Sequence, residues 1–424
     1  MRQQSVMHFF ILSVSATSSK CKRRIKVTRK STKYSNELSV QKYIADMTDG
    51  TENKKLRSGF TTGSCAAAAS KAAVWMLLSG NEKSEITIET PKGIPYTATL
   101  QDIKRTPECV SCAVIKDGGD DPDITSGTMI YSTVSFENNV SDNSSVRIII
   151  DGGEGVGRVT LPGLDQPVGE AAINSVPRKM IEKEVLEVCE LYDCQGTVKV
   201  IISVPEGKKL AEKTFNPKLG IEGGISIIGT SGIVEPMSTK AILDTIRLEL
   251  NQRRVQGFDT VVVSPGNYGI DFMKENYGYD LDRAVKCSNY IGICIDMARE
   301  LGFRKVLYVG HIGKLIKVAG GIMNTHSKEA DCRMEILSAV AIQKGLDAES
   351  VKEILSCITC EEAVKHIPDG EIRDEIMKEI AKRICVNLER RAGGETDVEC
   401  IVFSKELGEL AKSKGVKDGL KDFD

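Results

Sequence analysis

The pattern of apolar and polar positions divides the chain into two blocks with different architectures. In the first block, short runs in which Val, Ile or Thr alternate with polar residues predict half-buried strands. These predicted strands lie at 85–90, 95–101, 108–116, 127–134, 146–151 and 197–204. Helical periodicity predicts one helix that begins near residue 62, one that ends near residue 193 and one over about 238–254.

In the second block, continuous apolar runs alternate with helical segments. The runs at 260–263 and 306–309 are typical of strands that are buried on both faces of a parallel sheet. A helix predicted at 281–301 separates them, and this strand, turn, helix, strand order is half of a doubly wound sheet. Further helices are predicted near 328–345, 349–356 and 370–390, then a strand at 398–403 and a frayed tail from 412.

These patterns predict the α/β fold class, with an α+β N-terminal domain followed by a Rossmann-like α/β C-terminal domain. We place the glycine-rich N-terminal domain at 47–255 and the doubly wound domain at 256–424. Residues 1–46 are expected to be a disordered extension, with Met47 as an alternative translation start. A secretory signal or a transit peptide is the other interpretation of this extension.

Composition excludes several classes of function. The chain has 424 residues, enough for two or three domains, and its 41% hydrophobic and 27% charged residues are typical of a globular protein. The net charge of −2 argues against nucleic acid as a partner, although residues 1–36 hold nine Lys and Arg and no acidic residue. No apolar run is long enough to span a membrane, so we expect no membrane partner.

The 13 cysteines are scattered and odd in number, which favours reduced thiols in a cytoplasmic protein. Two Cys-x-x-Cys pairs occur, Cys109 with Cys112 and Cys357 with Cys360. Two such pairs can hold zinc when they converge. The alternation over 108–115 favours an ordinary strand instead, and we predict no metal site.

The segment 305–333 concentrates groups that can bind an anion. Its apolar run ends at glycine, and glycines after a strand let backbone N–H groups approach a ligand closely. The candidates here are Gly310, Gly313, His311, His326, Lys314 and Lys317. Leu315 follows the first lysine, so the segment is not a nucleotide P-loop. In a doubly wound sheet the turn with Gly266 and Gly269 would lie beside it.

Two further segments are candidates in the first block. Thr61, Thr62, Gly63 and Ser64 precede an alanine run, so they predict a helix start whose N–H groups favour an anion. The turn over 116–123 carries four acids, which could accept hydrogen bonds from hydroxyl or amino groups or bind a divalent metal. As alternatives, the first is an ordinary N-cap and the second a solvated acidic turn.

The chain resembles the cobalt-precorrin-5B (C1)-methyltransferases of anaerobic cobalamin biosynthesis. The resemblance spans roughly 56–345 and is carried by Arg-Ser-Gly-Phe-Thr-Thr-Gly-Ser-Cys-Ala at 57–66, Ile-Lys-Asp-Gly-Gly-Asp-Asp-Pro-Asp at 115–123, Gly-Gly-Glu-Gly-Val-Gly-Arg-Val-Thr at 152–160, the glycine-rich 216–238, Cys-Ser-Asn-Tyr-Ile-Gly at 287–292, Gly-His-Ile-Gly-Lys-Leu at 310–315 and Thr-His-Ser at 325–327. Ser64, Ser231 and Cys332 depart from the residues expected of many members.

The resemblance implies methyl transfer from S-adenosyl-L-methionine to C1 of cobalt-precorrin-5B, giving cobalt-precorrin-6A. Cobalt would be carried by the substrate. His311 and His326 would then be the catalytic candidates, because imidazole titrates near neutral pH. The candidates for the substrate carboxylates are Thr61, Thr62, Gly63, Ser64, Arg158, Lys213, Lys314 and Lys317. The candidates for S-adenosylmethionine are Asp117, Gly118, Gly119, Asp120, Gly266, Gly269, Gly310 and Gly313.

Two other classes stay open at this point. A nucleotide-dependent oxidoreductase would need an acid about 20 residues after the first glycine turn, and Asp282 and Glu300 are poorly placed for this. A non-catalytic corrinoid-binding or tetrapyrrole-binding protein would not bind S-adenosylmethionine. The expected partner is a cobalt-corrinoid small molecule, while homo-oligomerisation and hand-over to other corrin-pathway enzymes are left open.

Overall fold

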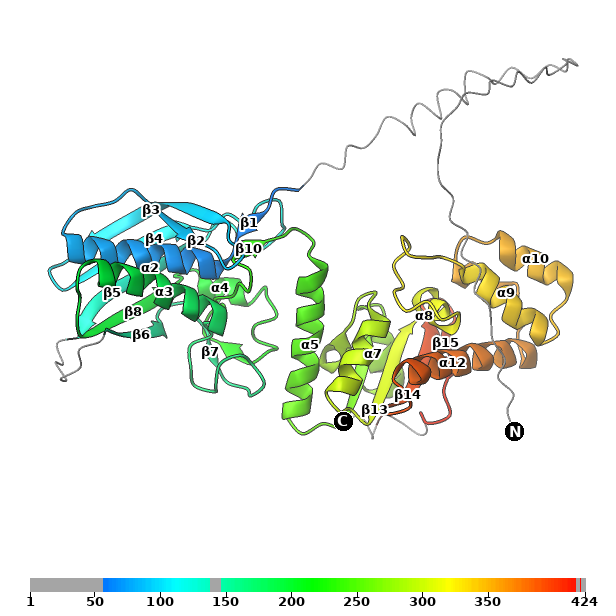
Figure 1. Cartoon of the computed structure of the whole chain (residues 1–424). Helices are drawn as coiled ribbons and strands as arrows, with labels where there is room; N and C mark the ends of the chain where they lie inside the picture. The colour runs from blue at the N-terminus through cyan, green and yellow to red at the C-terminus, as the bar shows by residue number, and fades with distance from the viewer. Residues whose placement is uncertain (1–55, 138–145, 417–419, 421–424) are drawn as a thin grey trace, which may run out of the picture. The chain divides into compact units, whose positions relative to one another are not determined.

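The computed structural model describes residues 56–137, 146–416 and 420, and the segment from Leu56 onward forms one compact unit. Two main sheets, each covered by helices, confirm the predicted α/β class (Figure 1). The proposed domain boundaries stay a prediction. The predicted extension over 1–46 lies outside the described residues.

The first sheet is mostly antiparallel. Its strands, in spatial order, are β2 (Glu85–Glu89), β3 (Pro95–Arg105), β4 (Cys109–Ile115), β5 (Met129–Glu137), β8 (Thr197–Ser203) and β6 (Arg147–Gly152). Only β6 and β8 pair in parallel. All six predicted strands of this block are confirmed. Alternation of buried and more exposed residues is clearest in β2 and β8, whereas β6 shows none.

Helices α2 (Thr62–Ser79) and α3 (Ser175–Leu191) pack together against this sheet (Figure 1). The run of alanines in α2 is fully buried, and small side chains allow the helix to approach both α3 and the strands. Lys71 Nζ lies 2.7 Å from the buried Glu184 carboxylate and ties the two helices together. The helix predicted to begin near residue 62 is therefore a core element.

Glycines let the irregular segments around this sheet pack backbone against backbone. The elements here are β1 (Gly59–Phe60), which pairs with β10 (Ile233–Val234), β7 (Arg158–Val159), which pairs with β9 (Ile221–Glu222), and α4 (Gly207–Ala211). A Cβ added to Gly155, whose φ is +70°, would lie 1.7 Å from the Val204 oxygen. A Cβ at Gly224 would lie 2.1 Å from the Gly155 oxygen. These glycines are required by chain packing.

The second sheet is parallel except at one edge. Its spatial order is β12 (Val285–Lys286), β11 (Thr260–Ser264), β13 (Lys305–His311), β14 (Asp397–Ser404) and the antiparallel β15 (Gly408–Lys412). The predicted strands at 260–263, 306–309 and 398–403 are confirmed. The helices are α5 (Thr239–Val255), α6 (Ile270–Tyr277), α7 (Ile291–Glu300), α8 (Ile312–Ala319), α9 (Arg333–Gln343), α10 (Ala348–Ser356), α11 (Cys360–Lys365) and α12 (Glu371–Arg391).

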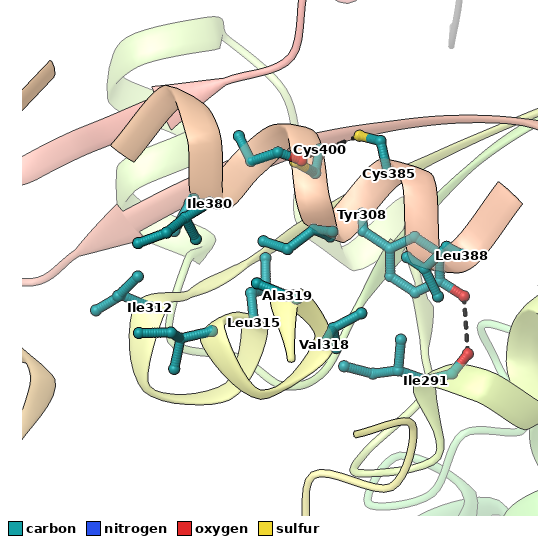
Figure 2. Close-up of a cluster of buried hydrophobic side chains, with 14 of the residues drawn as sticks. Ile291, Tyr308, Ile312, Leu315, Val318, Ala319, Ile380, Cys385, Leu388 and Cys400 are labelled. Carbon is teal, nitrogen blue, oxygen red and sulfur yellow. Dashed lines mark hydrogen bonds between the residues drawn. The ribbon is translucent and has the colours of Figure 1, made fainter. Parts of the chain in front are cut away.

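Both faces of the second sheet are buried, which explains its continuous apolar runs. Val306 and Tyr308 of β13 belong to one core cluster, and Leu307 and Val309 belong to another. Figure 2 shows Tyr308 among side chains of α8 and α12, with its hydroxyl donating to the Ile291 carbonyl at 3.0 Å. The same first cluster holds Ile246 and Leu250 of α5. The helix that we expected to close the first domain thus packs on the second sheet.

The helix predicted over 281–301 is wrong in its first half. A short 3-10 turn (Leu281–Arg283) and β12 occupy this part, and α7 begins only at Ile291. Val285 pairs with β11, and Ser288 has φ of +52°, so the chain turns there instead of continuing a helix. The hydrophobic pattern did not predict α6, α8, α11 and β15, which are all short. The helix predicted from residue 328 begins at Arg333.

The expectation of a frayed tail from residue 412 is wrong for the residues that the structure describes. Val416 and Leu420 are 3% and 4% exposed and pack with Met273 and Phe403 in the second core cluster of this sheet. Apolar residues at these two positions therefore anchor the C-terminal segment among its charged neighbours.

Candidate functional site

The turns after β11 and β13 meet at the carboxyl edge of the second sheet, as predicted. The ammonium group of Lys314 donates to the Pro265 carbonyl at 2.9 Å and so links the two turns. They enclose a cavity of about 80 Å³. Of the predicted site residues, it is lined by Gly266, Gly269, Gly310, His311, Gly313 and Lys314. We call this cavity the two-turn site.

His311 holds the second turn in shape. It is the N-cap of α8, and its Nδ1 accepts a hydrogen bond from the Gly313 N–H at 3.1 Å. Its Nε2 lies 3.0 Å from Glu361 Oε1. An accepting Nδ1 carries no proton, so this geometry describes a neutral imidazole that donates from Nε2. Both ring nitrogens are therefore engaged.

Glu361, at the start of α11, is the hydrogen-bond partner of the His311 imidazole. Its Oε1 also accepts from the Ser404 hydroxyl at 2.8 Å and the Lys405 N–H at 2.9 Å. Burial by itself would raise the pKa of Glu361, but these hydrogen bonds outweigh it and lower the pKa to about 2. A fixed carboxylate therefore orients His311 and joins α11 to the end of β14.

Lys314 is a cation in a partly buried position. Burial lowers its pKa, while the nearby Cys287 thiol opposes that shift. Phe403, Tyr268 and Ser264 also line the two-turn site. A Cβ at Gly269 would lie 2.9 Å from the Phe403 ring, so glycine is needed for the turn to pass this ring. The site thus combines one cation, one imidazole and two aromatic side chains.

A larger cavity adjoins the two-turn site. Its volume is about 430 Å³, and it shares Pro265 and Gly266 with the smaller cavity. Its basic lining residues are Lys218, Arg253, Arg283 and Lys286. Glu249 is the single acidic residue among the described residues that line it. We call it the cationic cavity.

Two predicted residues of the 305–333 segment lie outside the two-turn site. Lys317 is 4% exposed and donates to the carbonyls of Ala330 at 2.7 Å and Thr325 at 3.4 Å. It therefore ties down the loop that follows α8. His326 is exposed on that loop, where its Nδ1 accepts from the Lys328 N–H at 3.0 Å.

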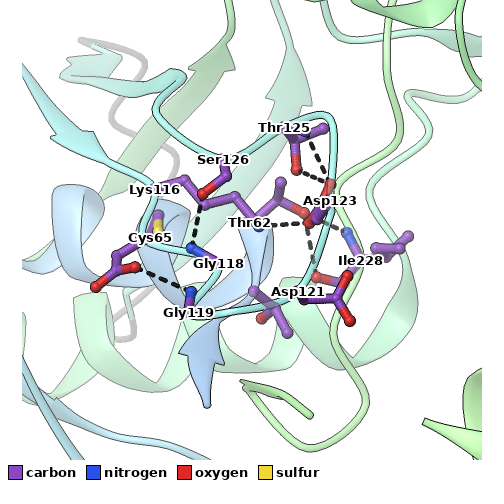
Figure 3. A network of polar contacts seen from close by, with 12 residues as sticks. Thr62, Cys65, Lys116, Gly118, Gly119, Asp121, Asp123, Thr125, Ser126 and Ile228 are labelled. Atoms are coloured by element: carbon purple, nitrogen blue, oxygen red, sulfur yellow. Dashed lines mark hydrogen bonds and ion pairs between the residues drawn. The ribbon is translucent and has the colours of Figure 1, made fainter. Parts of the chain in front are cut away.

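At the helix start, the chain itself engages the N–H groups of Gly63 and Ser64, so these two groups do not face a ligand. A ligand role for Thr61–Ser64 stays a prediction. The Thr61 hydroxyl caps the Ser64 N–H, and the Gly63 N–H donates to the Ile228 carbonyl at 3.0 Å. The Thr62 hydroxyl bonds both the N–H and the carbonyl of Ile228, as Figure 3 shows in part. The chain's own glycine-rich loop occupies the position where we expected an anion.

The Asp117–Asp120 turn is likewise engaged by its own chain. Arg57 forms two hydrogen bonds to Asp117, of 2.5 and 2.8 Å, and the Asp120 carboxylate accepts from the Arg57 N–H at 2.7 Å. The hydrogen bond from Arg57 lowers the pKa of Asp117 to about 2. The Gly118 N–H donates to the Ser126 hydroxyl (Figure 3), and a Cβ at Gly119 would lie 2.1 Å from the Arg57 oxygen.

The remaining predicted cations lie apart from the two-turn site. Arg158 pairs with Asp151 at 2.8 Å, and Lys213 is exposed after α4. Next to the first sheet, a third cavity of about 370 Å³ is lined by Thr61, Thr62 and a mixture of apolar and polar side chains. Its cation is the buried Lys116, which Asp123 neutralises at 2.5 Å (Figure 3).

The sequence reading missed Glu361, Phe403 and the basic residues of the cationic cavity. Glu361 lies 50 residues after its partner His311, so no local spacing pattern could reveal it. Arg253 and Arg283 look like ordinary exposed arginines in the sequence. Only the packing of α5 beside the β11 turn brings them together.

No group of three or more metal-ligating side chains occurs in the described part of the chain. The twelve cysteines that the structure describes are all free. Within the same residues, no helix is long and apolar enough to cross a membrane.

The fold is that of an α/β protein with a cavity at the carboxyl edge of a parallel sheet, where proteins of this class commonly bind their ligands. Two family models match the sequence. The CbiD model matches residues 49–236, and the CbiD C-terminal domain model matches residues 324–414. The chain belongs to the CbiD family.

Three relatives share one name. The chain is 46% identical over 351 residues to "Cobalt-precorrin-5B C(1)-methyltransferase" of Ruminiclostridium cellulolyticum, covering 83% of this chain and 90% of the relative. A namesake from Alkaliphilus metalliredigens is also 46% identical, over 87% of this chain and 98% of the relative. A third relative of the same name, from Methanocaldococcus jannaschii, is 40% identical over 83% of this chain and 94% of the relative. A crystal structure of the cobalamin biosynthesis protein cbiD from Archaeoglobus fulgidus matches with 25% identity and a TM-score of 0.33, over 66% of this chain and 82% of that chain.

Proposed function

We propose that this chain transfers a methyl group from S-adenosylmethionine to C1 of cobalt-precorrin-5B. The observation that carries the proposal is the 46% identity, over nearly the whole length of two relatives, to enzymes named for that reaction. The two-turn site and the cationic cavity beside it support a reaction between two ligands, because a donor and an acceptor must meet.

The chemistry places modest demands on the protein. A nucleophilic ring carbon attacks the sulfonium methyl group in line with the departing sulfur, and S-adenosylhomocysteine leaves with the bonding electron pair. No covalent bond to the protein is needed. The enzyme must align donor and acceptor and exclude water, which are large contributions to rate in two-substrate reactions.

We assign S-adenosylmethionine to the two-turn site. The glycines after β11 and β13 let a ligand lie close to the backbone, and a Cβ at Gly266 would meet nothing within 4 Å, so this glycine borders open space. Lys314 offers a charge to the carboxylate of the donor. The Asp117–Asp120 turn is the weaker candidate, since Arg57 already occupies its carboxylates.

For His311 the contacts support a positioning role. Proton uptake at Nδ1 would break the hydrogen bond that caps α8. Glu361 and Nε2 together keep the imidazole in one orientation next to the Gly310 turn. His326 remains a candidate proton acceptor, on the exposed loop after α8.

Binding of S-adenosylmethionine tests this assignment. We expect the wild-type chain to bind it in calorimetry and Lys314→Gln to bind it about tenfold more weakly, the usual effect of losing one charge-assisted hydrogen bond. Lys328→Gln, on the exposed loop, is the matched control and should bind as the wild type does. Equal affinity in Lys314→Gln would move the donor to another site, and no binding by the wild type would favour a non-catalytic corrinoid-binding protein.

A further inference from the structure

The cationic cavity gathers four basic side chains and one acidic side chain in its lining. Three arginines elsewhere around this sheet are paired with acids: Arg247 with Glu300, Arg391 with Asp296 and Arg333 with Asp331. In contrast, neither Arg253 nor Arg283 has a carboxylate partner within ion-pair distance among the described residues. The Arg253 guanidinium donates to the Arg283 carbonyl at 2.6 Å instead. Their positive charges are therefore available to a ligand.

Hydrogen bonds to backbone carbonyls help to fix the walls of this cavity. Lys286 Nζ donates to the Leu281 carbonyl at 2.7 Å, and Gln252 Nε2 donates to the Leu219 carbonyl at 2.7 Å. Leu250 on α5 and Val285 on β12 belong to one buried cluster, so the two elements that carry the cations are packed together. The core and these hydrogen bonds to backbone carbonyls thus hold in place the elements that carry Arg253, Arg283 and Lys286.

The acid of the cavity reinforces the pattern. Glu249 accepts a hydrogen bond from the Lys286 N–H at 3.1 Å, so its carboxylate is turned toward the backbone of β12. Burial raises its pKa, against the opposing effect of that hydrogen bond and of nearby cations. The third cavity differs, because Lys116 there is already neutralised by Asp123.

We propose that the cationic cavity is the carboxylate-recognition site for the corrinoid, with Arg253 and Arg283 as the principal anchors and Lys218 and Lys286 as supporting charges. The inference rests on the proposed function, because it takes the acceptor to be a macrocycle whose rim carries acetate and propionate groups. A cavity of about 430 Å³ admits an edge of such a ring. Since it shares Pro265 and Gly266 with the two-turn site, an edge bound here sets the ring beside the donor.

The test is an anaerobic titration of cobalt-precorrin-5B, without S-adenosylmethionine, followed by the visible absorbance of the corrinoid. We expect Arg253→Gln combined with Arg283→Gln to raise the Kd about 100-fold, since each lost charge-assisted contact weakens binding about tenfold. Arg247→Gln, on the same helix but paired with Glu300, should leave the Kd unchanged. The Kd for S-adenosylmethionine should not change in the double variant, which separates the corrinoid carboxylates from the carboxylate of the donor.

A corrinoid whose carboxylates are methyl esters provides the second arm. Its Kd should be the same for the wild type and the double variant, and insensitive to salt, whereas the Kd of the free acid for the wild type should rise with ionic strength. The comparison at different salt concentrations holds even if the double variant folds poorly, because it uses only the wild type. Salt-independent binding of the acid, or an equal loss for acid and ester in a folded double variant, would overturn the inference.

Failure of this inference and failure of the proposed function give different results. If the wild type methylates the corrinoid while the double variant binds it normally, the cavity assignment is wrong and the function stands. If the wild type binds the corrinoid through Arg253 and Arg283 but transfers no methyl group, the assignment stands and the function does not. A wild type that does neither overturns both.

Discussion

Both ring nitrogens of His311 form hydrogen bonds that fit a helix-capping role. A substitution that keeps the cap but cannot take up a proton distinguishes this role from proton transfer. Asparagine is a good N-cap and cannot take up a proton near neutral pH. We therefore expect His311→Asn to keep the melting temperature within a few degrees and the shape of the pH–rate profile. His311→Ala removes the cap and should lower the free energy of unfolding by about 1 kcal/mol.

The pH–rate profile decides between the two roles of this residue. If one limb of the wild-type profile disappears in His311→Asn while the protein stays folded, then His311 accepts a proton and the capping account is incomplete. The same comparison with His326→Asn examines the second imidazole.

Glu361 makes stability depend on pH in a defined window. Its folded pKa of about 2 lies below the ordinary value of 4.5, so its contribution is complete above pH 4.5 and is lost as the pH falls toward 2. We expect Glu361→Gln to lower the free energy of unfolding by about 1–2 kcal/mol at pH 7, and the difference from the wild type to shrink between pH 4.5 and 2. Urea unfolding at several pH values measures this; a constant difference would contradict it.

At the scale of elements, α2 shows why close packing demands small residues. A Cβ added to Gly63 would lie 2.8 Å from the Pro177 side chain and 3.1 Å from the Ile228 oxygen. We expect Gly63→Ala to lower the free energy of unfolding by about 1–3 kcal/mol, the usual cost of overpacking. Gly266→Ala is the stability control, because its Cβ would meet nothing within 4 Å. Equal effects in the two variants would mean that the contact at Gly63 does not matter.

The C-terminal segment is a second element whose role the structure makes testable. Val416 is buried beside α6, whereas Lys414, two positions earlier, is exposed. Val416→Ala should destabilise the protein by about 1–3 kcal/mol through lost burial, and Lys414→Ala by less than about 0.5 kcal/mol. A chain that tolerates both changes equally would have a tail that does not contribute to the core.

The helices and strands also show what could be predicted from the sequence. Strands with alternation, such as β4, and strands buried on both faces, such as β13, were predicted because burial leaves a regular pattern along the chain. Short elements such as α8 and β12 were missed. Their eight and two residues are stabilised by neighbours in space, and too few positions exist to reveal a period.

At the scale of the whole molecule, the candidate site was predicted only where topology brings it together. Parallel strands place the Gly266 and Gly310 turns at one edge, so their meeting at Lys314 could be expected. Charge alone was a poor guide, because Lys317 and Asp117 are satisfied by the chain itself. Arg253 and Arg283 could not be found, since only the packing of α5 beside the β11 turn brings them to one cavity.

The most direct test of the account is the reaction itself. Wild-type protein would be incubated anaerobically with cobalt-precorrin-5B and methyl-labelled S-adenosylmethionine, the corrinoid analysed by mass spectrometry, and the new group located by NMR. We predict the gain of one labelled methyl group at C1 together with release of S-adenosylhomocysteine. Unmethylated corrinoid, recovered from folded protein that binds both ligands, would contradict the assignment of this chain as a methyltransferase.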